Sequence, residues 1–204
     1  IFQMKFLFFI FTFFYVNFSL SQSNDSPNLD YESKQELSWN EWINNLKKDL
    51  KNDGFKNSTI YLLDDLSFNP RVVELDRKQP EFKLTFKKYL DRNINDHRIK
   101  ELNQKITENS ILLKEIYEKF GVDPKIIASL WAIETSFGKY LGKFDILRSL
   151  SSLAYDGRRK DFFLKELRIA LKILDQGHIN RKQFKGSWAG AFGQTQFMPS
   201  TFKK

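Results

Sequence analysis

One carboxylate, Glu134, lies in a run whose pattern predicts a helix with a partly buried surface. The run Leu130 to Gly138 reads LWAIETSFG. Asp123 and Pro124 predict the helix start, because aspartate accepts hydrogen bonds from unpaired backbone donors and proline suits the first helical position. The glycine that closes the run predicts the end of the helix, which is therefore expected to cover about residues 124–137.

The position of Glu134 on this helix predicts a carboxyl group with a raised pKa. Apolar side chains at three- and four-residue spacing predict a buried stripe, whose members are Ile126, Leu130, Ile133 and Phe137. Glu134 is on the flank of that stripe, so we expect it to be half-buried. Loss of water disfavours its charged form and favours a proton at neutral pH, as a general acid for glycosidic cleavage requires. The alternative is an ordinary solvated or paired glutamate.

A second segment supplies groups that can face this carboxylate. Residues 186–202 read GSWAGAFGQTQFMPSTF, and we call them the Gly-rich segment. Glycines permit tight backbone turns, and hydroxyl and amide side chains suit the polar groups of sugars. Together the helix and the Gly-rich segment predict a sugar-cleaving active site.

The rest of the chain is predicted to be helical almost throughout. Apolar residues at helical spacing predict further helices, within residues 39–50, 59–67, 96–120 and 162–174. The stretch that contains Pro70 and Pro80 is expected to be irregular, and no convincing alternating strand pattern occurs. The predicted fold class is all-α, a globular packing of about seven or eight helices.

The composition of the chain limits the kinds of catalytic and metal-binding site that it can form. The chain has 204 residues, 41% of them apolar, which is enough for one domain with a sizeable core. It has no cysteine, which excludes disulfides, thiol catalysis, cysteine-bound metal and a lipid-modified N-terminal cysteine. Its two histidines, His97 and His178, lack companions at ligand spacing. We therefore assign neither a metal nor a cofactor.

The beginning of the chain has the pattern of an export signal. From Met4 it reads MKFLFFIFTFFYVNFSLS, with one basic residue, a Phe-rich apolar run and small residues near Ser21. A permanent membrane anchor is the less favoured alternative, because the apolar run is short and contains polar residues. We expect a signal peptide at 1–21, a flexible linker at 22–38 and one domain at 39–204.

The sequence from about Trp39 to its last residue resembles the lytic murein transglycosylases of the membrane-bound B type. The most specific matches are Phe120-Gly121-Val122 before the predicted helix of Glu134, LSSLAYDGRR at residues 150–159, and GSWAGAFGQTQFMPS. The resemblance implies a lysozyme-like helical fold. It also implies an enzyme that cuts the glycan strands of peptidoglycan without water.

In that family a single residue, matched here by Glu134, is both catalytic acid and base. The resemblance implies that Glu134 protonates the bridging oxygen of the β-1,4 bond between N-acetylmuramic acid and N-acetylglucosamine. It then takes the proton of the muramyl C6 hydroxyl, which attacks C1 and closes a 1,6-anhydro ring. One carboxylate suffices because the nucleophile belongs to the substrate, whereas ordinary glycosidases need a second acid.

The resemblance also suggests residues that bind substrate. Ser187 and Gln196 match polar positions that line the sugar site, with loop capping as their alternative role. Arg158 and Arg159 are candidates to bind a lactyl or stem-peptide carboxylate, with a surface role or pairing with Asp156 as the alternative. Tyr89 is a candidate for stacking on a sugar ring, as is Phe192, with a place in the core as the alternative for both.

The formal net charge of +8 favours an acidic partner. No nucleic-acid-binding motif accompanies the charge, so peptidoglycan, with its stem-peptide carboxylates, and anionic lipid are better candidates than nucleic acid. With the resemblance, we expect peptidoglycan strands as partner, no nucleic acid, and membrane contact only through the signal segment. A solvated basic surface without a specific partner is the alternative. Export without a lipid-bearing cysteine predicts a periplasmic protein, with cell-wall synthesis or remodelling proteins as further candidate partners.

Two other functions remain open on the sequence. A lysozyme-like hydrolase would use Glu134 with a second acid, for which Asp145 and Asp156 are available. A non-catalytic peptidoglycan-binding protein would keep the groove without turnover. The family's catalytic domain continues beyond the position of Lys204, with a segment that can bind calcium, so we expect the domain to be incomplete on its C-terminal side.

Overall fold

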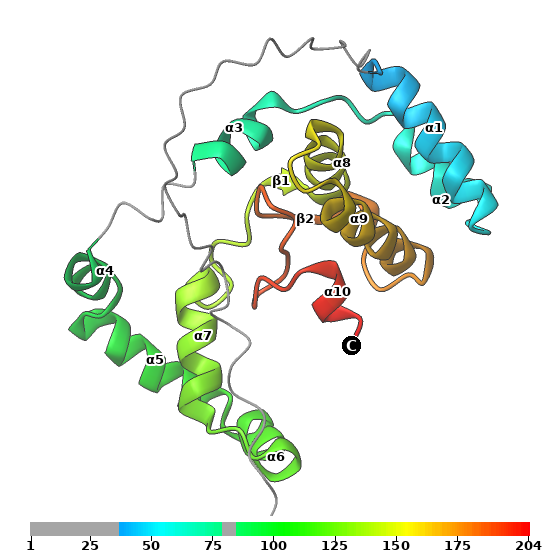
Figure 1. The fold of residues 1–204 in the computed structure, drawn as a ribbon. Coiled ribbons are helices and arrows are strands. Elements are labelled where there is room, and N and C mark those ends of the chain that lie inside the picture. Colours follow the sequence, from blue (N-terminus) through cyan, green and yellow to red (C-terminus); the bar gives the residue numbers. More distant parts are fainter. Residues whose placement is uncertain (1–36, 79–84) are drawn as a thin grey trace, which may run out of the picture. The chain divides into compact units, whose positions relative to one another are not determined.

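Helices make up most of the protein (Figure 1). The computed structural model describes residues 37–78 and 85–204. The elements within these ranges are α1 (Trp39–Asn52), α2 (Asn57–Ile60), η1 (Tyr61–Leu63), α3 (Pro70–Lys78), α4 (Phe86–Asn93), α5 (Asp96–Glu108), α6 (Ser110–Phe120), α7 (Pro124–Thr135), β1 (Phe144–Asp145), α8 (Ile146–Asp156), α9 (Lys160–Asp175), η3 (Arg181–Gln183), β2 (Lys185–Gly186) and α10 (Pro199–Phe202). The prediction of an all-α fold is confirmed, with two very short strands as the exception.

The hairpin formed by α8 and α9 is the centre of the hydrophobic core (Figure 1). Each helix has one apolar face with three- and four-residue spacing. Its fully buried large side chains include Leu147, Leu150 and Leu153 of α8 and Phe163, Leu167 and Leu171 of α9. Complete burial of one such side chain stabilises a fold by about 1.5–3 kcal/mol. Two further helices pack on this hairpin: α3 contacts α8, and α10 contacts α9.

The helix that carries Glu134, α7, begins where the sequence predicted. Asp123 caps it by accepting a hydrogen bond from the backbone nitrogen of Lys125 at 2.7 Å, and Pro124 is in the first turn. The helix ends at Thr135 rather than at 137, because the next residues, starting with Ser136 at φ 49°, adopt positive φ angles.

The apolar residues predicted to form a stripe on α7 do recur at helical spacing, but the prediction that they are buried is wrong for most of them. Ile126, Leu130 and Ile133 are 47%, 38% and 48% exposed, and only Phe137 is buried. The helix packs against α5 and α6. Its buried residues are Ala128, Ala132 and Thr135. Periodicity identifies an apolar face, but it does not show which neighbouring element covers that face.

Two other element predictions need correction. The expected helix over 96–120 is divided into α5 and α6 at Asn109, whose side chain donates a hydrogen bond to the carbonyl of Lys105 at 2.8 Å. The expected irregular stretch contains α3, which begins at Pro70. Proline is favoured there because its missing N–H would be unpaired in the first turn in any case.

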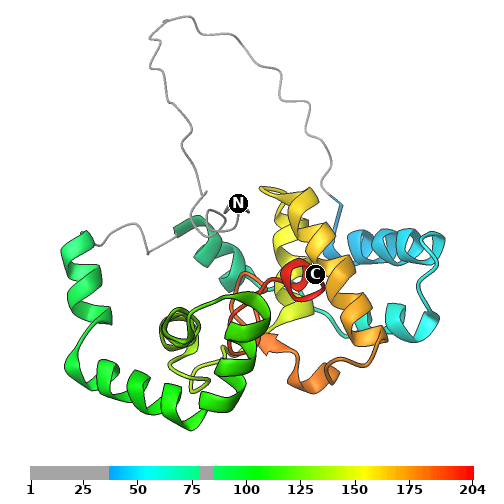
Figure 2. The same ribbon diagram turned by 90° about the horizontal axis from the view of Figure 1, so that it is seen from below.

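Two short strands bring the Gly-rich segment next to the chain that follows α7. β1 pairs with β2 in antiparallel register, with Asp145 opposite Lys185. Single bridges at Phe192 then fold the Gly-rich segment back on itself. The segment ends in α10, which lies beside α9 (Figure 2).

The predicted signal peptide at 1–21, and the predicted linker at 22–38 up to residue 36, lie outside the described residues. Ser38, at the end of the predicted linker, is the N-cap of α1 and forms a capping box with Glu41. No helix in the described part of the chain is both long and apolar enough to cross a membrane.

Candidate active site

Glu134 is in the last turn of α7. The residue as a whole is exposed, whereas its carboxyl group is partly desolvated, so the prediction of half-burial holds for the carboxyl group but not for the whole side chain. Protein atoms around the carboxyl group displace part of its water. This partial desolvation raises the pKa of Glu134. No hydrogen bond or ion pair from another described residue opposes the shift. The predicted direction of the pKa shift is confirmed, and it suits proton donation.

The neighbouring residue, Thr135, connects the helix end to the Gly-rich segment. Its side chain is 1% exposed. The Thr135 hydroxyl donates to the carbonyl of Gln194 at 2.7 Å and accepts from the backbone nitrogen of Gly138 at 3.0 Å. This hydroxyl therefore fixes the end of α7, and with it the backbone of Glu134, against the predicted sugar-binding segment. Thr135 was not among the site residues predicted from the sequence, although its position directly after the candidate acid was an available signal.

Ser187 stabilises a tight turn at the start of the Gly-rich segment. Its Oγ accepts a hydrogen bond from the backbone nitrogen of Ala191 at 3.0 Å, and its own backbone nitrogen donates to the Ala191 carbonyl at 2.8 Å. A Cβ at the preceding Gly186 would lie 2.1 Å from that carbonyl oxygen, so only glycine fits. The Ser187 hydroxyl hydrogen is not used by these bonds, so it can still be donated to a ligand.

Gln196 joins two loops. Its φ angle is 49°. Its Nε2 donates to the carbonyl of Leu141 at 3.2 Å and to that of Gly193 at 2.9 Å. Both amide hydrogens are thus directed at carbonyls, and Oε1 is the atom available to accept a hydrogen bond from a ligand.

The two candidate arginines surround a buried aspartate. Arg158 Nε donates to Asp76 Oδ2 at 2.7 Å, and Arg159 Nη2 donates to Asp76 Oδ1 at 3.1 Å. Asp76 is only 1% exposed, and its hydrogen bond raises the pKa of Arg158. Arg159 also lies over the ring of Phe163. These contacts join α3 to the turn between α8 and α9, while carboxylate binding by the two arginines stays a prediction.

The two aromatic candidates have different surroundings. Tyr89 is on α4 and is 44% exposed, so its ring is accessible for stacking, and its role stays a prediction. Phe192 is 5% exposed and contacts the ring of Phe184 edge-on, with centroids 4.8 Å apart. Its position matches the alternative of a core residue.

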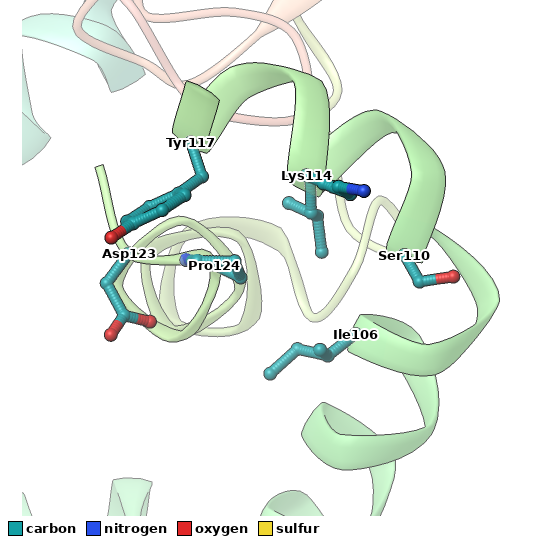
Figure 3. Close-up of a pocket in the computed structure, with 7 residues that line it drawn as sticks. Ile106, Ser110, Lys114, Tyr117, Asp123 and Pro124 are labelled. Atoms are coloured by element: carbon teal, nitrogen blue, oxygen red, sulfur yellow. The ribbon is translucent and has the colours of Figure 1, made fainter. Parts of the chain in front are cut away.

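A pocket that sequence analysis did not predict lies at the other end of α7 (Figure 3). It has a volume of about 400 Å³ and is lined by residues of α5, α6 and the start of α7, namely Ile106, Ser110, Leu113, Lys114, Tyr117, Asp123 and Pro124. Glu134 follows Pro124 by three turns of helix, which is on the order of 15 Å. The pocket is therefore separate from the carboxylate.

Within residues 37–78 and 85–204, no group of three or more histidine, cysteine, aspartate or glutamate side chains could hold a metal ion.

Fold and site together define a helical protein with one catalytically suited carboxyl group at a helix end, held against a glycine-rich loop. The model of the Transglycosylase SLT domain matches residues 38–204, and the chain belongs to that family. The chain is 37% identical over 93 residues to membrane-bound lytic murein transglycosylase B of Escherichia coli (strain K12), a match that covers 45% of this chain and 26% of that protein.

Solved structures agree with this assignment. SltB3 from Pseudomonas aeruginosa in complex with NAG-NAM-pentapeptide matches with a TM-score of 0.77 and 34% identity, over 81% of this chain and 45% of SltB3. The complex of the same protein with NAG-anhNAM-pentapeptide matches with the same TM-score and identity, over 81% of this chain and 44% of SltB3. The chain thus spans less than half the length of these relatives. Its lysozyme-like transglycosylase fold is confirmed.

Proposed function

We propose that the protein is a lytic transglycosylase that cleaves the β-1,4 bond between N-acetylmuramic acid and N-acetylglucosamine in peptidoglycan. The observation that carries the proposal is the raised pKa of Glu134, at a helix end fixed to the Gly-rich segment. Family membership supports the reaction class, and the muropeptide ligand of SltB3 supports the substrate class.

In the proposed reaction Glu134 acts twice. As the acid it protonates the bridging oxygen while the bond from that oxygen to the muramyl C1 breaks, and N-acetylglucosamine leaves as an alcohol. As the carboxylate it then accepts the proton of the muramyl C6 hydroxyl, whose oxygen forms a bond to C1. The product is a 1,6-anhydromuramyl end, Glu134 regains its proton, and no water is consumed. The NAG-anhNAM-pentapeptide bound to SltB3 supports this product.

The surroundings of the other candidate acids favour a lyase over a hydrolase. Asp145 Oδ1 accepts from the backbone nitrogen of Arg148 at 2.9 Å, and its Oδ2 accepts from Arg181 at 2.6 Å. Asp156 accepts from Arg77 at 2.5 Å. Each carboxylate is engaged in a structural contact, so neither is placed as the free second acid that a hydrolase needs.

Substrate binding is proposed for groups with unused hydrogen-bonding capacity. The Ser187 hydroxyl can donate to a sugar, and Gln196 Oε1 can accept from an acetamido N–H. Tyr89 is exposed and can stack on a sugar ring. For Arg158 and Arg159, binding of a substrate carboxylate would have to coexist with their contacts to Asp76.

We also propose that the protein acts in the periplasm, after export directed by residues 1–21, and that its partners include cell-wall synthesis or remodelling proteins. In the periplasm the protein would meet peptidoglycan, and nucleic acid would not compete for its basic surface. Sequencing the N-terminus of the exported protein tests the proposal, because cleavage after Ser21 gives a chain that starts at Gln22.

Digestion of purified peptidoglycan with the full-length protein, followed by mass analysis of the fragments, tests the reaction. We expect 1,6-anhydromuramyl ends from the unmodified protein and none from Glu134→Gln, which keeps the size of the side chain but cannot transfer a proton. Reducing ends would indicate a hydrolase instead. Binding of strands without any product would indicate a non-catalytic binding protein.

A further inference from the structure

Two exposed lysines, Lys143 and Lys185, flank the point where the Gly-rich segment begins. Lys185 is in β2, directly before Gly186 and two residues before Ser187. Lys143 directly precedes β1. Both lysines are exposed. They come from segments far apart in sequence that the short sheet brings together.

The backbone on both sides of Lys143 is held against Gly186. Phe144 is paired with Gly186 in the sheet. A Cβ at Gly142 would lie 2.1 Å from the Gly186 carbonyl oxygen, so these two backbones are in direct contact. The ring of Phe144 packs against the core, which leaves its neighbours Lys143 and Asp145 on the outer side of the strand. Lys143 is therefore fixed close to the predicted sugar-binding residue Ser187.

The negative charge opposite Lys185 in the sheet is already compensated. Asp145 is opposite Lys185 in the sheet, where facing Cβ atoms are about 5 Å apart. Its carboxylate, however, forms an ion pair with Arg181 at 2.6 Å and caps α8 through the backbone nitrogen of Arg148. Neither Lys143 nor Lys185 forms an ion pair with another residue of the described ranges. The outer surface of the sheet therefore carries two uncompensated ammonium groups.

We propose that Lys143 and Lys185 bind a carboxylate of the peptide attached to the muramyl sugar, while Ser187 and its neighbours bind the sugar itself. This inference rests on the proposed function. A neutral sugar does not require ammonium groups, whereas the stem peptide ends in a carboxylate, and the SltB3 complexes contain such a pentapeptide. Exposed ammonium groups that stay hydrated until a ligand arrives contribute modestly and depend on salt.

The test measures binding, so that it does not depend on turnover. In the Glu134→Gln background, the affinity of the full-length protein is measured for glycan strands that carry stem peptides and for the same strands after an amidase has removed the peptides. At low salt we expect Lys143→Ala and Lys185→Ala each to weaken binding of peptide-bearing strands about two- to fivefold. Binding of stripped strands should not change. Lys143→Arg and Lys185→Arg, which keep the charge, should restore most of the affinity.

Lys48→Ala, which removes an exposed lysine of α1, is the matched control and should leave both affinities unchanged. Equal weakening on both kinds of strand would overturn the proposal, as would no weakening on peptide-bearing strands. A loss of binding to anionic lipid vesicles without an effect on strands would assign the lysines to a membrane surface instead. Failure of the proposed function is a separate result, namely the absence of anhydro products from the protein that retains Glu134.

Discussion

The proposed reaction requires one group to hold a proton, release it and accept another at the same place. Glu134 is suited to this cycle because the partial desolvation of its carboxyl group disfavours the charged form and no described cation stabilises that charge. Asp156, by contrast, accepts a hydrogen bond from Arg77 and is already engaged in a structural contact. At the residue scale, the proposed function therefore depends on the absence of a described cation beside Glu134 as well as on the carboxyl group itself.

This environment predicts the pH dependence of the reaction. Free enzyme reacts only while Glu134 is protonated, so kcat/KM should fall as pH rises through the pKa of Glu134. Because partial desolvation raises that pKa, the fall should occur at a higher pH than an ordinary glutamate would give. Initial rates on soluble glycan strands across pH measure it. A fall centred at or below the ordinary glutamate pKa would contradict the role of Glu134.

The raised pKa of Glu134 also predicts that Glu134→Gln, which should remove activity, makes the folded protein more stable near neutral pH. A pKa that is higher in the folded than in the unfolded state means that the folded state binds more protons in that window, so stability falls as pH rises through it. Glu134→Gln removes this dependence. Thermal unfolding should therefore show a higher Tm for Glu134→Gln than for the unmodified protein near neutral pH. The difference should shrink below the pKa of an unfolded glutamate, and a lower Tm for the variant at neutral pH would refute the prediction.

At the element scale, the end of α7 and the Gly-rich segment form one unit through Thr135. Thr135→Val keeps the shape of the side chain but leaves the Gln194 carbonyl and the Gly138 nitrogen without this partner. An unpaired buried polar group costs about 1–3 kcal/mol, so we expect a lower free energy of unfolding and a lower kcat. Urea unfolding and turnover of glycan strands measure the two effects.

Thr135→Ser serves as the control, because it keeps the hydroxyl and should restore both stability and kcat. If Thr135→Val lowered stability but left kcat unchanged, the hydroxyl would support the fold without positioning Glu134.

The elements show how far sequence alone could lead. Local signals were sufficient for the start of α7, where Asp123 and Pro124 act within one turn. They were insufficient for Asn109, because a side chain that bonds to its own helix can end that helix inside an otherwise periodic run. The exposure of Ile133 and the partners of Arg158 depend on how distant segments pack together, which no spacing rule contains. The motif thus predicted the acid and its loop, whereas Thr135 and Lys143 required the structure.

At the scale of the whole chain, polar contacts join the first helices to the α8–α9 hairpin. The hydroxyl of Tyr155 donates to the carbonyl of Leu37 at 2.8 Å, and the hydroxyl of Thr59 donates to Asp175 at 2.7 Å. The ion pairs of Asp76 make a third connection, between α3 and the turn after α8. All three join segments that are remote in sequence, so they strengthen the packing of α1, α2 and α3 on the α8–α9 hairpin.

The Asp76 cluster gives a test that separates a structural from a substrate-binding role of its arginines. Replacing both Arg158 and Arg159 by alanine leaves a 1% exposed carboxylate without these two cations, which should cost about 3–5 kcal/mol. Asp76→Asn should cost less, about 1–3 kcal/mol, because the side chains of Arg158 and Arg159 are 45% and 25% exposed and can be hydrated. Urea unfolding of both variants measures the asymmetry, and KM for peptide-bearing strands is measured alongside it. A double arginine variant with unchanged stability and a raised KM would show that the two arginines serve the substrate rather than the fold.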